Sequence, residues 1–259
     1  MRLRFVILAM LFLSSAALHA AIGTMTLGED MAPDLSLDAS GRGWTWTANT
    51  STLTLTESFN GNDGINIACN TDDHIHINFT GNIFINGGSA SAIFCSGSLN
   101  IDGNGTLTLE SYNESVLATL NNLTINSGTL IINAKNNGEH AISSWKNLSI
   151  GGEANVVAKA TEGIGGGLHS GAQIFVIDNA NVSIVAAGEF HGINAAEGID
   201  IATQGAVSIS VTGSGIPLVA EEGKISISNG KLTLKKPGVK DLSELISGVV
   251  EQTGGVISD

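Results

Sequence analysis

Aromatic rings, carboxylates and imidazoles occur together in short polar segments that recur along the chain, as in Glu139-His140 and Glu189-Phe190-His191. Rings that stack on the C–H faces of a sugar, next to groups that hydrogen-bond its hydroxyls, are typical of saccharide recognition. Loops that are simply polar and expose an occasional ring are the alternative. The candidate carbohydrate-binding residues are Phe59, Tyr112, Glu139, His140, Glu189, Phe190 and His191.

A second set of side chains could bind a cation. Asp72 and Asp73 are adjacent, and Asp63 precedes them by about ten residues. Calcium prefers clustered carboxylate and carbonyl oxygens. No fixed loop motif accompanies these acids, so they indicate either a calcium site that assists binding or solvated surface carboxylates.

The residues that polysaccharide-cleaving enzymes require are scarce. A lyase needs a basic residue to abstract a proton, but beyond residue 20 the only arginine is Arg42. A glycosidase needs two carboxylates at a defined separation, and no pair is singled out by its spacing. We therefore name no catalytic residue and expect a protein without enzymatic activity, with a lyase or hydrolase as the less favoured alternative.

The two cysteines, Cys69 and Cys95, are 26 residues apart. In an exported protein this spacing, about one structural repeat, is compatible with a disulfide between stacked positions. Two buried thiols that act as small hydrophobic groups are the other interpretation.

The N-terminal segment and the net charge limit the classes of protein to which this chain can belong. Residues 1–20 have Arg2 and Arg4, then an apolar run and small residues, which predicts a signal peptide. We expect a secreted, periplasmic or cell-surface protein, and no other apolar run is long enough for a membrane helix. Without the signal peptide, 9 basic residues face 24 acidic ones. This balance argues against nucleic-acid partners, because phosphate backbones attract Lys and Arg.

A short alternating pattern repeats along the rest of the chain. Its first apolar positions are separated by 24 to 26 residues and are Ile75, Leu99, Leu123, Leu148, Ile174, Ile199 and Ile225. A second alternating pair follows in each unit after a turn rich in Asn, Asp and Gly. A third apolar position is expected at Ile65 or Ile67, Ile93, Val116, Ile142, Ile164, Ile193 and Leu218. Alternation with period two predicts strands with one buried face.

Three short strands per unit of about 25 residues predict an all-β, single-domain, right-handed parallel β-helix of about 7–8 coils. We expect an N-terminal cap at 21–43, coils from 44 to 236 that begin with Trp44 and Trp46 buried, and a C-terminal cap at 237–259. The cap strands are expected at 24–27 and 34–37, and an amphipathic helix at 241–250. Loops between the second and third strands vary most, and stacking would align them, with the candidate sugar-binding residues, along one edge.

Two features of the chain carry a resemblance to a known family: the run Gly-Arg-Gly-Trp-Thr-Trp-Thr-Ala-Asn-Thr-Ser-Thr-Leu-Thr-Leu at 41–55, and the coils that follow it with Ala-Ile at 92–93 and 141–142. Through these features the chain resembles exported bacterial carbohydrate-binding domain-containing proteins, which are right-handed β-helices similar to polysaccharide lyases. The resemblance implies non-catalytic binding of a polysaccharide, with calcium as an assisting ion. An adhesin-like structural or interaction protein is the alternative.

Overall fold

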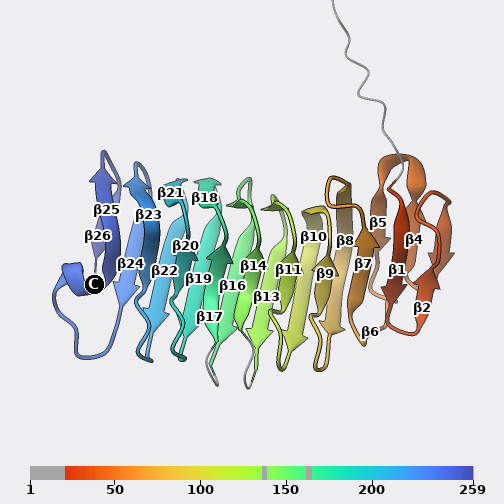
Figure 1. The fold of residues 1–259 in the computed structure, drawn as a ribbon, viewed down its shortest axis with the longest axis horizontal. Helices are drawn as coiled ribbons and strands as arrows, with labels where there is room; N and C mark the ends of the chain where they lie inside the picture. Colours follow the sequence, from red (N-terminus) through yellow and green to blue (C-terminus); the bar gives the residue numbers. More distant parts are fainter. Residues whose placement is uncertain (1–20, 136–138, 162–164, 259) are drawn as a thin grey trace, which may run out of the picture.

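The computed structural model describes residues 21–135, 139–161 and 165–258, so the predicted signal peptide lies outside the described residues. The chain is all-β, and its parallel coils form a β-solenoid of about 8 turns with a period of about 25 residues. The coils stack along the long axis, with the N-terminal strands at one end and the C-terminal strands at the other (Figure 1). The predicted parallel β-helix is therefore confirmed.

Each coil contributes a strand to each of three faces, which we call the first, second and third sheets. The first sheet contains β3 (Ala39–Gly41), β4 (Trp44–Thr47), β5 (Thr52–Leu55), β8 (His74–Asn86), β10 (Ser98–Ser111), β12 (Leu123–Ile125), β15 (Leu148–Ile150), β18 (Gln173–Asp178), β21 (Gly198–Thr203), β23 (Leu218–Ile227) and β25 (Ile246–Gln252). β8 and β10 continue through the turn into the second sheet.

The second and third sheets complete the coils. The second sheet adds β6 (Gly61–Asn62), β13 (Thr129–Ala134), β16 (Asn155–Ala160), β19 (Asn181–Ala186), β22 (Ala206–Val211), β24 (Lys231–Lys235) and β26 (Val256–Ser258). The third sheet contains β2 (Asp30–Ala32), β1 (Gly23–Leu27), β7 (Ile65–Cys69), β9 (Ile93–Cys95), β11 (Leu117–Thr119), β14 (His140–Ser144), β17 (Gly166–Ser170) and β20 (Ile193–Ala195), and it ends in the first residues of β23 and β25.

The core is the stack of inward side chains from these sheets. All seven predicted first-strand positions are at most 2% exposed, and they align in register from Ile75 to Ile225. The third-strand prediction is wrong at one coil, where Leu117 rather than Val116 takes the aligned position. Ile164 lies outside the described residues, and Leu168 occupies the aligned position of its coil. Variable loops shift the phase of the third strand, so simple counting loses its register.

The N-terminal cap extends further than predicted. β4 runs antiparallel to both β3 and β5, so Trp44 and Trp46 belong to a cap meander and not to the first parallel coil. Both rings are buried as expected, and their Nε1 atoms donate to Asp30 Oδ2 and to the Leu35 carbonyl. β1 matches the first expected cap strand. The second expected strand, at 34–37, is a turn that lies between β2 and β3.

The C-terminal segment differs from the expected helix. A single 3-10 turn, η2 (Leu242–Glu244), precedes β25 and β26, which add one more coil against β23 and β24. η1 (Ala48–Thr50) is the other short 3-10 helix. The valine-rich stretch 249–250 pairs with the coil before it because the open sheet edge offers unpaired backbone groups. Within the described ranges, no helix is long and apolar enough to cross a membrane.

Candidate functional site

The segments between the second and third sheets lie along one long edge of the rod, at the lower side of Figure 1. They align because the strands before and after them are paired in register, as in β13 with β16 and β14 with β17. Residues in successive loops therefore become neighbours, although they are about 25 positions apart in the sequence.

Three imidazoles and a phenylalanine gather at this edge. His140, the first residue of β14, stacks on His169 of β17 with ring centroids 4.8 Å apart and an interplanar angle of 12°. The His140 ring also contacts Phe190: the two ring centroids are 4.8 Å apart, and the ring planes are tilted by 38°. The Nδ1 of His191 accepts a hydrogen bond from the backbone N–H of Ile216 at 2.9 Å. We call His140, His169, Phe190 and His191 the ring cluster.

Gly166 makes the space for this packing. A Cβ at this position would lie 2.7 Å from His140 Nδ1 and 2.9 Å from the Cβ of Phe190, closer than side-chain atoms pack. Gly166 pairs with His140 in the parallel register between β14 and β17. The missing side chain therefore allows the imidazole to lie over the backbone of the next coil.

Several polar atoms beside the ring cluster are buried without a partner. His140 Nδ1, His169 Nδ1 and Asn194 Oδ1 make no hydrogen bond within the described part of the chain. Asn194 aligns with His169 on the next coil, and its Nδ2 donates to Glu221 Oε1 at 3.0 Å. Buried polar groups are nearly always hydrogen-bonded to protein, water or ligand. The two imidazole nitrogens can therefore donate to or accept from a hydroxyl of a bound molecule, whereas Asn194 Oδ1 can only accept.

The electrostatics favour neutral rings. Burial, together with the smaller effects of the neighbouring His169 and His191, lowers the pKa of His140 to about 3. Burial also lowers the pKa of His169, against the opposing effect of Glu221 and Glu139, and that of His191. At neutral pH each imidazole carries one N–H donor and one nitrogen acceptor. Such neutral rings suit the hydroxyl groups of a sugar unit better than an ionic group.

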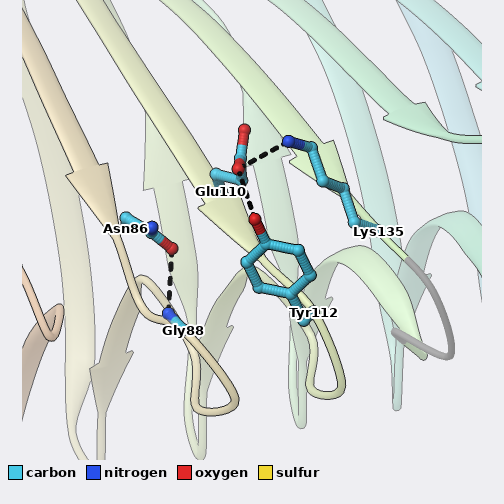
Figure 2. Close-up of polar contacts among 5 residues, drawn as sticks. All are labelled: Asn86, Gly88, Glu110, Tyr112 and Lys135. Carbon is cyan, nitrogen blue, oxygen red and sulfur yellow. Dashed lines mark hydrogen bonds and ion pairs between the residues drawn. The ribbon is translucent and has the colours of Figure 1, made fainter.

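A second group of contacts surrounds Tyr112 on the same edge (Figure 2). The Tyr112 hydroxyl donates to Glu110 Oε1 at 3.3 Å, and Lys135 Nζ lies 2.6 Å from the same oxygen. Lys135 Nζ also lies 5.6 Å from the centroid of the Tyr112 ring, within cation–π distance. In the preceding loop, Asn86 Oδ1 accepts from the backbone N–H of Gly88. Tyr112 is thus half-buried in a local network, apart from the ring cluster.

The seven predicted sugar-binding residues therefore separate into groups. His140, Phe190 and His191 meet in the ring cluster, where Phe190 remains 36% exposed, while Glu139 and Glu189 are exposed beside it in sequence. Tyr112 lies in its own network. Phe59 is only 8% exposed and packs in the core of the first coil, so its ring does not line the surface.

The acids considered for calcium have individual roles in turns. Asp73 Oδ2 accepts from the backbone N–H groups of Asn70 at 3.0 Å and Ile22 at 3.2 Å. Asp63 sits in a left-handed turn with φ of 67°, and Asp72 is exposed. No group of three or more His, Cys, Asp or Glu side chains in the described residues is placed to hold a metal ion.

The two cysteines are thiols in this structure, with Cys95 buried and Cys69 half-buried. Cys95 aligns with Ile67 and not with Cys69, so the cysteines are offset by two residues across adjacent coils. The neighbouring Cys95 thiol is the main cause that lowers the pKa of Cys69 to about 7, and hydrogen bonds from Ser96 and Gly97 act in the same direction. For Cys95, the neighbouring Cys69 thiol and burial raise the pKa. The disulfide stays a prediction.

Sequence reasoning missed three residues. His169 and Asn194 face outward in the third sheet, a position visible only when its register is known. Phe175 faces outward in the first sheet, where it lies between two shallow depressions of about 410 and 400 Å³. Polar side chains line these depressions, among them Asn100, Asn122, Asn147 and Gln173. The alternation of buried and outward residues in β18 could have predicted that Phe175 faces outward, because it lies between the buried Ile174 and Val176.

Comparison of the chain with family models, with curated proteins and with solved structures found no match.

Proposed function

We propose that this protein binds a polysaccharide without cleaving it, and that the ring cluster holds a sugar unit. The observation that supports the proposal best is the combination of a partly exposed Phe190 ring with stacked imidazoles whose buried Nδ1 atoms have no partner in the described residues. Phe190 offers an apolar face for C–H stacking, while His140, His169 and Asn194 offer hydrogen-bonding groups. Export by the predicted signal peptide would place the protein where polysaccharides occur.

The rod supports extended binding as well. Loops at the edge repeat once per coil, roughly every 4.8 Å, so a linear polymer could contact several coils. The proposal does not include calcium, because no three His, Cys, Asp or Glu side chains in the described residues are grouped to hold a metal ion.

The test is binding of the purified protein to a panel of soluble and insoluble polysaccharides, with calcium and with chelator, together with assays for reducing-end and unsaturated products. We expect binding without products. Phe190→Ala should reduce binding strongly, whereas Trp145→Ala should not, because Trp145 is 72% exposed but lies outside the ring cluster. Equal binding by both variants would contradict the assignment of the site, and product release would contradict the absence of catalysis.

A protein-contact function is the second candidate. Val249, Val250 and Val256 are 62%, 39% and 59% exposed on the last coil, where β25 has β23 as its one paired strand among the described residues. An exposed strand edge with apolar side chains favours association with another chain. This candidate would gain support if no glycan bound and the mass measured in solution rose with protein concentration.

A further inference from the structure

The second sheet has a charge that is opposite to that of the whole molecule. The chain carries a formal net charge of −13, yet strands β13, β16, β19, β22 and β24 contain no acidic residue. Their charged residues are Lys159 on β16 and Lys231 and Lys235 on β24. The part of β10 that belongs to this sheet carries one acid, Glu110, which lies two layers from Lys159 on the same ladder and is paired with Lys135. All three lysines are exposed, and none has an ion pair in the described part of the chain.

The parallel register fixes where these lysines lie. Lys159 aligns with Val185, then Ser210, then Lys235, so Lys159 and Lys235 are three layers apart on one ladder, roughly 14 Å. Lys231 and Lys235 are four residues apart on one strand, roughly 13 Å. The three ammonium groups therefore spread over a flat face and do not converge on a single small anion. Hydroxyl and amide side chains, among them Ser208 and Asn181, lie between them.

This lysine face meets the ring cluster at the edge. Lys159 and Lys235 lie near the ends of their strands, where the chain turns into the edge loops. Lys236 follows directly and donates to the carbonyls of Ser214 and Gly215 at 3.1 and 2.9 Å. The charge of Lys236 is also one of the causes that lower the pKa of His191. The lysine face and the ring cluster therefore meet at this edge, where the exposed carboxylates of Glu139 and Glu189 lie beside the ring cluster in sequence.

We propose that the polysaccharide is anionic and that it lies across the lysine face, with carboxylate or sulfate groups opposite Lys159, Lys231 and Lys235. This inference rests on the proposed function, because the ring cluster holds one sugar unit of the same chain. Widely spaced cations on a flat face suit a linear polymer with regularly repeated charges. The acidic remainder of the molecule repels the polymer elsewhere and so directs it to this face.

The experiment compares dextran sulfate with unmodified dextran, which has the same sugar backbone without charge. We expect tighter binding of dextran sulfate at low salt and a steep loss of that difference as salt is raised, since exposed charges are screened. The double variant Lys231→Gln/Lys235→Gln should weaken dextran sulfate binding on the order of ten-fold, because each exposed ion pair contributes modestly. The control Lys146→Gln/Lys224→Gln removes equal charge outside the face and should bind as the wild type does.

The possible failures are distinguishable. If the wild type binds neutral glycans through Phe190 but shows neither charge preference nor salt dependence, the inference is wrong and the proposed function stands. If neither dextran nor dextran sulfate nor any other glycan binds, both are wrong. Equal loss of binding in the two double variants would indicate net charge rather than this face. Binding of duplex DNA or of anionic lipid vesicles as tight as that of dextran sulfate would overturn the assignment to a polysaccharide.

Discussion

Protonation of His140 should destabilise the folded protein at acid pH. The imidazole has a pKa of about 3 in the folded chain because of burial, against 6.5 as its ordinary value. Between these two values the unfolded chain binds the proton and the folded chain does not. The contribution to stability is therefore complete above pH 6.5 and is lost as pH falls towards 3.

The size of the effect follows from the same two values. Between pH 7.5 and pH 4.5 the linkage lowers the free energy of unfolding by about 2.7 kcal/mol for His140 alone. This is an upper limit, because His140 is only half-buried and water screens part of the charge. His169 and His191 have lowered pKa values too, so they add to the loss with the same sign.

The assay is urea unfolding, followed by circular dichroism, at pH 7.5 and pH 4.5 for the wild type and His140→Gln. We expect the loss of stability on acidification to be smaller in the variant by at least about 1 kcal/mol. Comparing the two pH values within each protein cancels the constant cost of replacing the ring. His74→Gln is the matched control, because His74 is exposed on β8. Parallel losses in the wild type and His140→Gln would refute the reasoning.

Three further predictions test the packing and the turns. Gly166→Ala should weaken glycan binding several-fold while the fold persists, because the new Cβ would displace the ring of His140 or Phe190; unchanged affinity would contradict this. Leu123→Ala removes a fully buried side chain between Leu99 and Leu148, and thermal or urea unfolding should show a loss of about 2–5 kcal/mol, whereas a loss below about 1 would argue against a tightly packed core. Asp73→Ala should cost about 1 kcal/mol by removing the acceptor of two backbone N–H groups, and the cost should be the same with calcium and with chelator; a calcium-dependent difference would show that a metal binds there.

Much of the fold could be predicted because its information is local and repeated. Each coil buries the same alternating positions, so the spacing from Ile75 to Ile225 defines the period, the three strands per coil and the core. The caps were less predictable, since each occurs once and has no repeat to support it. Trp44 and Trp46 alternate like coil residues, yet their strand is antiparallel because β3 and β5 flank it on both sides.

The candidate site shows the same division. The sequence by itself determined that rings, imidazoles and carboxylates belong to variable loops, and that stacking brings such loops to one edge. It did not determine that His140 would lie on His169, that Phe59 would turn into the core, or that Tyr112 would bond to Glu110. Those outcomes depend on the lengths of neighbouring loops and on the open position at Gly166. Only the tertiary structure decides them, because contacts between coils join residues about 25 positions apart, and a shift of one residue changes the neighbours of every side chain on the edge.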